Sequence, residues 1–481
     1  MATAASLYTA STGLCADSIE SVPGVDGVFA LATYHVDKHE QQQATSSSSS
    51  PSSTQSQDEL GQDEASLSAT SSSPAYTRRG TCNLYYIASE GRDGTKCDKV
   101  DMIETPAILD MKWSLTKAAG KAELRRTLGV ANAQGQITLH RLYGSEKASK
   151  LQSIGELQFN NRTALCLSLD FSDRRGGHIG GYNMSTPDVD TSLIVSQSDG
   201  SLAYLPSLEL ALANTCASSV DDVTSSLAET SIHKHTHSSA ETEAPDDDWD
   251  RTSQDERDSA LLSKHLDLNS IHPIKPRGLI TWAAHEFESW ICAFDCFSPT
   301  TTAWSGGDDL TLKGWDLRTP LSSPTTIPNP TFVCKKPFNG GVTSIQSHHL
   351  RQHLWAVGSY DGYLRLFDAR MTARPLSETE VGGGVWRVKW HPEDSKRLLV
   401  GCMHDGFKVL TLEELAVEGV QGGELRGKEF CLATKFDQHK SLAYGCDWDR
   451  GLNQDPEESG RRVYSCSFYD ATMHIWNSGA S

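Results

Sequence analysis

The chain has 481 residues, a formal net charge of -19, 37% hydrophobic residues and 12 cysteines. This acidic balance argues against a surface that neutralises nucleic-acid phosphates and favours cationic partners. No stretch approaches the ~18 apolar residues of a membrane span, and the first residues lack the basic and apolar regions of a secretory signal. Because the cysteines form no CxxC pair and no zinc-like cluster, we expect a cytoplasmic protein that needs no metal or cofactor.

The N-terminal segments predict one blade of a repeat protein and a strand that closes a ring. Residues 16–23, 28–36 and 82–88 alternate in the manner of strands. Between them, residues 37–81 are dominated by Ser, Gln, Thr and acidic residues, which predicts a disordered insertion. Residues 6–12 are expected to supply the outer strand of the last blade, so residues 1–36 hold this closing strand and the start of blade 1. Closure removes exposed sheet edges.

The middle of the chain repeats the same rhythm and then breaks it. Residues 82–217 are predicted to hold the rest of blade 1 and blades 2 and 3, from strand-like pairs such as TPAILDMKW with TLGVANAQGQITLHRL. Residues 218–270 form an acidic insertion containing HKHTH at 233–237. Histidines at this spacing are able to bind a metal, but in a polar acidic setting they are more typical of a solvated loop. The chain is therefore predicted to hold no metal.

Residues 282–318 have the layout of one complete WD-repeat blade. His285, Ser305, Asp309 and Trp315 fall in the order in which a histidine bridges a turn aspartate to a serine and an indole N–H. The serine, histidine and aspartate also resemble a Ser-His-Asp catalytic triad. A structural strut is the favoured interpretation, because the serine of such a blade is packed within its second strand.

Three further blades follow, which places blades 4–7 in residues 271–477. Their segments are GGVTSIQS with LWAVGSYDGYLRLFDAR, GGGVWRVKWHP with LLVGCMHDGFKVL, and SLAYGCDW with VYSCSFYDATMHIWN. The predicted fold is therefore all-β, a seven-bladed WD-repeat β-propeller with disordered or loop insertions.

Alignment of the blades by their turns brings three aromatic residues to one position, Trp290, Trp386 and Tyr444. Strand alternation predicts that they line the inner part of the ring near one mouth. Aromatic side chains that converge there are able to hold a quaternary ammonium by cation–π attraction. Glu288, two residues before Trp290, adds an acidic group to this predicted substrate site. Ordinary packing between blades is the alternative.

A second candidate site comes from a broken pattern in the sixth blade. His404 stands where the tight-turn aspartate belongs, Asp405 follows it, and Arg387 adjoins Trp386. A site with His404 as general base, Arg387 or backbone N–H groups stabilising an oxyanion, and Trp386 as a binding wall is chemically feasible. The alternative is that the sixth blade is a degenerate repeat, in which His404 has replaced the turn aspartate without gaining a function. The chain contains no nucleophile elbow, nucleotide-binding glycine loop or HExxH motif.

Two blade ends suggest a non-catalytic alternative. Residues 315–318, WDLR, and 367–370, FDAR, look like the WDxR motif by which some propellers dock to a cullin-RING ubiquitin ligase. An adaptor would depend on Arg318, whereas an enzyme would depend on the histidines of the top face.

Several longer strings are more distinctive than any WD dipeptide. TPAILDMKW, AHEFESWICAFD, GSYDGYLRLFDAR, GGGVWRVKWHP, GCMHDGFKVL and AYGCDW occur in this order. Together they closely resemble the WD-repeat family of diphthamide biosynthesis, the diphthine methylesterases (also called diphthine methyltransferases). The resemblance covers roughly residues 14–36 and 82–477 and implies hydrolysis of the methyl ester of diphthine, a modified histidine of elongation factor 2, to the acid and methanol.

The resemblance supplies no catalytic residues that can be carried over. From the residues themselves, His404 with Asp405 is the first candidate for the base and His285 the second. The trimethylammonium group of diphthine would give the cage of Trp290, Trp386 and Tyr444 a cation to hold.

Overall fold

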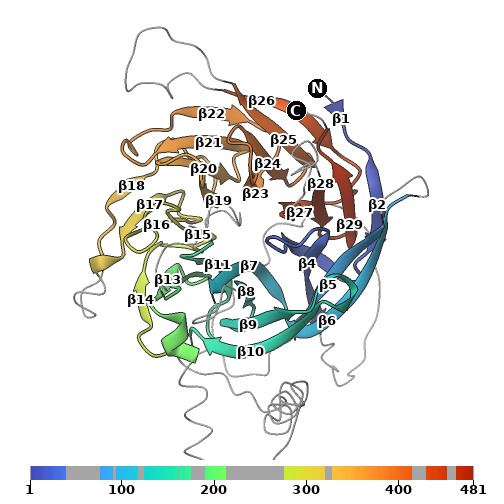
Figure 1. The fold of residues 1–481 in the computed structure, drawn as a ribbon. Helices are drawn as coiled ribbons and strands as arrows, with labels where there is room; N and C mark the ends of the chain where they lie inside the picture. The colour runs from blue at the N-terminus through green and yellow to red at the C-terminus, as the bar shows by residue number, and fades with distance from the viewer. Residues whose placement is uncertain are drawn as a thin grey trace, which may run out of the picture.

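The computed structural model describes residues 2–38, 76–89, 94–117, 124–160, 162–174, 190–212, 276–319, 328–413, 429–451 and 462–479. Seven sheets are arranged around a central axis, so the predicted seven-bladed β-propeller is confirmed (Figure 1). The HKHTH cluster and almost all of the two expected insertions lie outside the described residues. Among the described residues, no helix is long and apolar enough to cross a membrane.

Each blade runs outward from the axis as an antiparallel meander. Blade 1 consists of β3 (Cys15–Ser21), β4 (Val28–Lys38), β5 (Tyr76–Ser89) and β6 (Lys96–Pro106). Blade 2 consists of β7 (Ile108–Lys117), β8 (Leu124–Asn132), β9 (Gln136–Tyr143) and β10 (Lys150–Gln158). Blade 3 consists of β11 (Cys166–Phe171), β12 (Leu193–Gln197), β13 (Ser201–Leu205) and β14 (Ile280–Ala283).

The remaining blades repeat this order. Blade 4 consists of β15 (Ile291–Phe294), β16 (Thr302–Gly306), β17 (Leu312–Asp316) and β18 (Phe332–Cys334). Blade 5 consists of β19 (Val342–Ser347), β20 (Leu354–Ser359), β21 (Tyr363–Asp368) and β22 (Ser377–Glu380). Blade 6 consists of β23 (Val385–Trp390), β24 (Arg397–Cys402), β25 (Phe407–Glu413) and β26 (Glu429–Phe436). Blade 7 consists of β27 (Ala443–Trp448), β28 (Arg462–Ser467), β29 (Thr472–Asn477) and, from the N-terminus, β2 (Ser6–Ser11).

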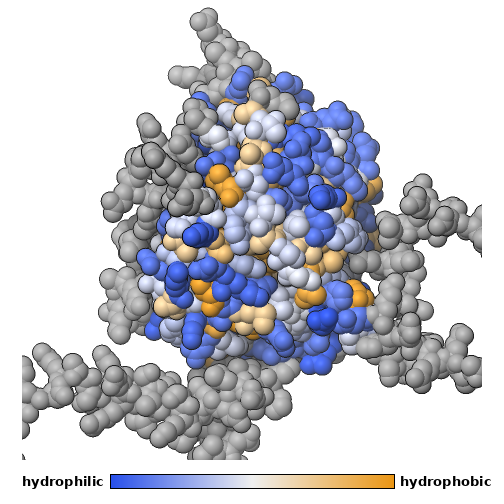
Figure 2. Space-filling view, turned by 90° about the vertical axis from the view of Figure 1, so that its right-hand side faces the viewer, coloured by the Kyte–Doolittle hydropathy of each residue, from blue (hydrophilic) through white to orange (hydrophobic). Residues whose placement is uncertain are grey.

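The N-terminal residues close the ring. β2 pairs antiparallel with β29, as expected for a closing strand, and β1 (Ala2–Thr3) pairs parallel with β26 of blade 6. One short segment therefore ties blades 6 and 7 together. In blade 1, β4 and β5 pair as far as Lys38 and Tyr76, so these strands extend into both ends of segment 37–81. On the side of the ring that includes β2, polar and neutral side chains predominate, with separated hydrophobic residues (Figure 2).

Apolar side chains fill the spaces between neighbouring blades. Trp304 of blade 4 stacks on Trp355 of blade 5 with ring centroids 4.1 Å apart, and Phe436 stacks on Trp476 at 4.8 Å between blades 6 and 7. Each offset contact of this kind adds roughly 0.5–1.5 kcal/mol beyond simple burial. The core is therefore distributed around the ring, which leaves the axis for other residues.

Buried charges occupy the axis. Glu20 on β3 forms ion pairs with Lys389 on β23, with Lys112 on β7 at 3.3 Å and with Arg174 beyond β11 at 3.5 Å. Burial alone would raise the Glu20 pKa, but the three cations outweigh it and hold the pKa well below its ordinary value. Glu20 thus joins inner strands of blades 1, 2 and 6 to the segment after the inner strand of blade 3.

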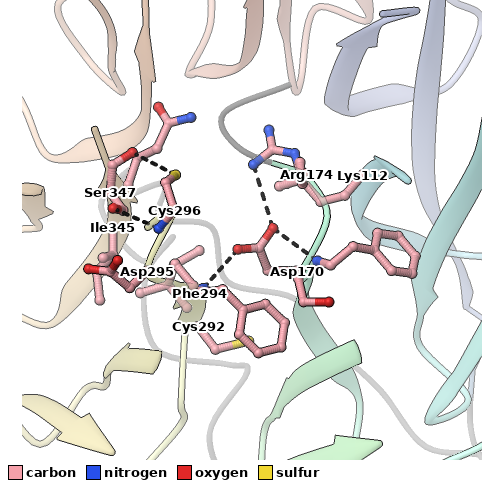
Figure 3. A pocket seen from close by; sticks show the side chains of 14 residues that line it. Lys112, Asp170, Arg174, Cys292, Phe294, Asp295, Cys296, Ile345 and Ser347 are labelled. Carbon is pink, nitrogen blue, oxygen red and sulfur yellow. Dashed lines mark hydrogen bonds and ion pairs between the residues drawn. The ribbon is translucent and has the colours of Figure 1, made fainter. Parts of the chain in front are cut away.

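A small cavity of about 30 Å³ lies beside these charges (Figure 3). Lys112, Asp170, Arg174 and Cys296 contribute to its lining, and Asp170 faces Arg174 and the backbone N–H of Phe294 across it. A space of this size holds roughly one or two water molecules. It is therefore too small to hold an organic ligand.

Candidate functional site

One face of the ring, here called the entrance face, collects the loops that precede the inner strands and the turns between second and third strands. The seven inner strands start on this face because each blade is an antiparallel meander that begins at the axis. The entrance face therefore carries Trp290, Trp386 and Tyr444 near the starts of β15, β23 and β27.

The structure brings these three aromatic side chains together. The ring centroids of Trp290 and Trp386 are 5.8 Å apart, and those of Trp386 and Tyr444 are 4.9 Å apart in a stacked arrangement. All three side chains are partly exposed, unlike the buried Trp390 and Trp448 four residues further along their strands. Their rings therefore form a half-exposed aromatic surface at the mouth and are only partly used in packing between blades.

Tyr360 is a fourth member that the sequence alignment missed. Its ring centroid lies 6.1 Å from that of Trp290 and 5.8 Å from that of Trp386. In blade 5 the position aligned with these tryptophans is Thr343, and Tyr360 from the turn after β20 fills the space instead. An aromatic residue directly before the turn residue Asp361 was the signal that could have identified it.

Two acidic residues lie beside this aromatic surface. The indole N–H of Trp290 donates to the carboxylate of Asp308 at 3.2 Å, and the side chain of Asp308 is exposed. Glu288 is partly buried in the loop before Trp290, and its carbonyl oxygen accepts the backbone N–H of Asp308 at 2.9 Å. The loop that carries Trp290 is thus fixed to the turn that carries Asp308, and a negative charge stands at its rim.

His404 lies on the same face, beside the aromatic surface. It follows Met403, whose carbonyl oxygen accepts the backbone N–H of Ala443 at 2.8 Å, directly before Tyr444. The imidazole is exposed and makes no hydrogen bond to any other described residue. It is therefore exposed to solvent on the entrance face.

Asp405 does not orient this imidazole. Its carboxylate forms ion pairs with Lys408 and, at 2.7 Å, with Lys435. Burial works in the opposite direction, but these lysines hold the Asp405 pKa below its ordinary value. In blade 4 the turn aspartate Asp309 pairs with Lys313, and Lys408 occupies the same register position in blade 6. Asp405 therefore makes the ion pair of a turn aspartate in blade 6, in place of His404.

Arg387 points into the axis. Its guanidinium donates to the carbonyl oxygen of Leu109 at 3.2 Å and lies 3.4 Å from the carboxylate of Asp110 on β7. Only 8% of the residue is exposed. Arg387 therefore pairs with a charge across the ring. It does not form a site with His404, as the sequence had suggested.

The four residues of the complete blade form a continuous chain of hydrogen bonds. His285 contacts Asp309 at 2.9 Å through Nδ1 and Ser305 at 2.7 Å through Nε2, and Trp315 donates to Ser305 at 2.8 Å. His285 is 7% exposed, and burial lowers its pKa more than Asp309 raises it. This geometry favours the strut and leaves His285 no free nitrogen for a substrate.

Blade 7 contains a second strut that the sequence reading missed. His439 contacts Ser467 at 2.7 Å and Ser465 at 2.8 Å, Trp476 donates to Ser465 at 3.1 Å, and Asp470 accepts from Ser467. Serine and aspartate are separated by five positions here instead of four, so the template of blade 4 does not detect it. Among the described residues, the complete histidine–serine–tryptophan chain occurs in blades 4 and 7.

The two WDxR-like ends are paired within themselves. Arg318 forms an ion pair with Asp316 at 2.7 Å, and Arg370 with Asp368 at 2.6 Å. Both arginine side chains remain largely exposed. In the described part of the chain, no group of three or more His, Cys, Asp or Glu residues is arranged to hold a metal ion.

The chain is similar to a group of proteins that share one name. A human protein named diphthine methyltransferase is 30% identical over 461 residues, which cover 94% of this chain and 77% of the human protein. A Dictyostelium discoideum protein named diphthine methyltransferase homolog is 29% identical over 373 residues, 77% of this chain and 76% of its own length. A Saccharomyces cerevisiae protein named diphthine methyltransferase is 30% identical over 219 residues, 40% of this chain and 49% of its own. No family model matches the chain.

Proposed function

The chain belongs to the diphthine methyltransferase family, and on that premise we propose that it removes the methyl ester of diphthine on elongation factor 2 by hydrolysis. Family membership supports a role in diphthamide biosynthesis. Within that role, hydrolysis produces the free carboxylate and methanol. The same proposal places the chain in the cytoplasm, with elongation factor 2 as its partner.

The observation that carries this proposal is the convergence of four partly exposed aromatic rings on the face that also carries an exposed histidine. Diphthine carries a trimethylammonium group next to its ester. Such a cation gains about 0.5–2 kcal/mol over an aromatic face, and Trp290, Tyr360, Trp386 and Tyr444 offer several faces in one place. Asp308 adds a negative charge at the rim. A trimethylammonium group held here would bring its ester close to His404.

The proposed reaction needs only water as co-substrate. His404 accepts a proton from water as it adds to the ester carbonyl carbon, the bond to the methoxy group breaks, and the proton is returned to the leaving methoxide to give methanol. Arg387 is given no part, because Asp110 and the Leu109 carbonyl oxygen already hold it. Stabilisation of the oxyanion is assigned to backbone N–H groups of the entrance loops.

The loop of Gly382, Gly383 and Gly384 is the candidate source of these backbone donors. It packs directly on the turn of His404, since a Cβ on Gly382 would lie 2.3 Å from a carboxylate oxygen of Asp405 and one on Gly383 would lie 2.7 Å from the Cys402 carbonyl oxygen. Gly382 also has a φ of 84°, which L residues with side chains rarely adopt.

The test incubates the purified chain with elongation factor 2 that carries methyl-esterified diphthine, in water enriched in oxygen-18. We expect methanol release, loss of one methylene-equivalent mass, and one oxygen-18 atom in the product carboxylate. A mass increase that requires an added methyl donor would overturn the hydrolase proposal in favour of methyl transfer.

The role of His404 is tested by His404→Gln. Because general base catalysis contributes roughly 10²–10⁴-fold, kcat is expected to fall by that factor while the protein remains folded. His353→Gln, in the loop between β19 and β20 on the opposite face, is the matched control and should keep wild-type turnover. Unchanged turnover in His404→Gln would remove this residue from the mechanism.

The alternative is an adaptor that binds without catalysis. The exposed guanidinium groups of Arg318 and Arg370 are the features that favour it. Tight binding of elongation factor 2 with no mass change, together with loss of a ubiquitin-ligase partner in Arg318→Ala, would support this function in place of the esterase.

A further inference from the structure

We infer that the aromatic surface extends into a docking surface for the polypeptide segment that carries the modified side chain, with Phe287 and Tyr469 as its two anchors. The identity of the partner rests on the proposed function. The surface itself follows from the positions, exposure and rigidity of these two residues.

The aromatic contacts do not stop at the cage. From Tyr444 they continue to Phe468 at a centroid distance of 5.0 Å, and from Phe468 to Tyr469 at 4.9 Å and to Tyr34 of blade 1 at 6.0 Å. Tyr469 therefore lies at the blade 7 end of one aromatic chain. Phe287 stands on the side of Trp290, three residues before it in the loop that leads into blade 4. The two anchors thus flank the proposed site.

Both anchors expose large apolar surfaces. Phe287 is 58% exposed and Tyr469 is 66% exposed, the two highest values among large hydrophobic residues in the described part of the chain. Exposure of this size on an aromatic residue is unfavourable in isolation and becomes favourable when a partner covers it. Together with the partly exposed cage, these anchors place several accessible aromatic side chains on the entrance face.

The loop of Phe287 is fixed by the strut of blade 4. The backbone N–H of Glu286 donates to the carboxylate of Asp309 at 3.2 Å, His285 is held by the same carboxylate, and the N–H of Ser289 donates to the carbonyl oxygen of Gln197 at 3.2 Å. The exposed ring is therefore presented from a backbone held on both sides.

The turn of Tyr469 is fixed by the strut of blade 7. The N–H of Tyr469 donates to the hydroxyl of Ser441 at 3.1 Å, and Asp470 accepts from Ser467 and from the N–H of Lys440. The two blades with a complete strut are thus the two that carry the exposed anchors. A rigid aromatic anchor loses little conformational entropy on binding, which is the property of residues that dominate interfaces.

The occupant is the segment of elongation factor 2 that carries the esterified diphthine. Its cation enters the cage, and apolar or aliphatic parts of the neighbouring residues cover Phe287 and Tyr469. Exposed Glu286 and Asp308 near the Phe287 end favour a segment with basic side chains on that side. The anchors therefore determine specificity for the intact protein substrate over a free modified amino acid.

The test measures hydrolysis of two substrates by Phe287→Ser, Tyr469→Ser and the double variant. The substrates are intact elongation factor 2 bearing the methyl ester and a free diphthine methyl ester too small to reach the anchors. We expect KM for the intact factor to rise about ten-fold in each single variant with kcat unchanged, and kcat/KM for the small substrate to change less than two-fold. Phe297→Ser is the matched control, because Phe297 is 43% exposed in the loop after β15 on the opposite face.

The outcomes separate this inference from the function on which it rests. Wild-type KM for the intact factor in both anchor variants would overturn the docking surface and leave the esterase standing. If the wild-type chain hydrolyses neither substrate, the esterase proposal fails. The docking surface is then tested by calorimetry, which compares the Kd for the esterified factor between the wild-type chain and the anchor variants. An unchanged Kd in the variants would contradict the docking surface. An equal loss of kcat/KM on both substrates would show that the anchors act on the fold of the site, which also contradicts the inference.

Discussion

The axis and the entrance face of this propeller use charged and aromatic residues in opposite ways. At the axis, Glu20 pairs with Lys112 and Lys389, and Asp110 pairs with Lys112 and Arg387, so each of these two buried carboxylates has a cation on another blade. At the entrance face, Trp290 and Trp386 remain half-exposed, and His404 has no hydrogen-bonding partner among the described residues. Satisfied buried charges serve the structure, whereas accessible groups are free to act on a partner.

A single strand shows both uses. β23 contributes Trp386 to the aromatic surface, Arg387 and Lys389 to the axial charges, and Trp390 to the core between blades. Substitutions on this strand and at its partners should therefore separate stability from substrate binding.

The largest effect on stability is expected from Glu20→Gln. This change leaves Lys112, Arg174 and Lys389 without their shared carboxylate, and breaking a buried pair costs about 3–5 kcal/mol. Urea denaturation should show the corresponding loss in the free energy of unfolding, with KM unchanged at temperatures where the variant is folded.

Asp316→Asn is the control for this prediction, because it removes an ion pair whose arginine is exposed on the surface. Little change in the free energy of unfolding is expected. Equal stability of the two variants would contradict a structural role for the axial charges.

An effect of similar size on stability is expected when Trp390→Ala is compared with Trp386→Ala on the same strand. Trp390 is fully buried, so its truncation should lower the free energy of unfolding by about 3–5 kcal/mol. Trp386 is half-exposed, so its truncation should cost less stability but raise KM for the methyl ester about ten-fold through loss of cation–π attraction. A KM increase in the Trp390 variant alone would place the cation elsewhere. The paired measurement is steady-state kinetics with urea denaturation.

Local sequence patterns predicted the blades well because each blade is a short-range meander with its own turns. The cage residues Trp290, Trp386 and Tyr444 could be aligned for the same reason. Tyr360 was missed because it reaches the cage from a turn instead of an inner strand. The strut of blade 7 was missed because one extra residue separates Ser465 from Asp470.

The partners of Arg387 could not be predicted at all. Leu109, whose carbonyl oxygen accepts from its guanidinium, lies 278 positions away in the sequence. Only closure of the ring brings these two strands together, so no local sequence pattern could predict the contact between Arg387 and Leu109. The grouping of Arg387 with His404 rested on a broken repeat, which says that a residue has left its usual role but not where its side chain goes.

The smallest predicted effect is on the pH dependence of stability, and it comes from the buried histidines of the two struts. Burial lowers the pKa of His439 to about 3, so below its ordinary value of 6.5 the unfolded chain binds a proton that the folded chain does not. The unfolded state then holds more protons, and stability falls as pH falls. Between pH 7 and pH 5 the wild-type Tm should therefore decrease, because His140 and His348, whose pKa burial lowers to about 4, act in the same direction and outweigh Asp173, whose pKa burial raises to about 6.

His439→Gln should have a lower Tm at pH 7, because it disturbs the contacts with Ser465 and Ser467, but a shallower decrease from pH 7 to pH 5. His285→Gln should behave in the same direction, since burial also lowers the pKa of His285. Phe297→Ser, which removes no titratable group, should keep the wild-type slope. If His439→Gln also kept the wild-type slope, the assignment of this pH dependence to the buried strut histidine would be contradicted.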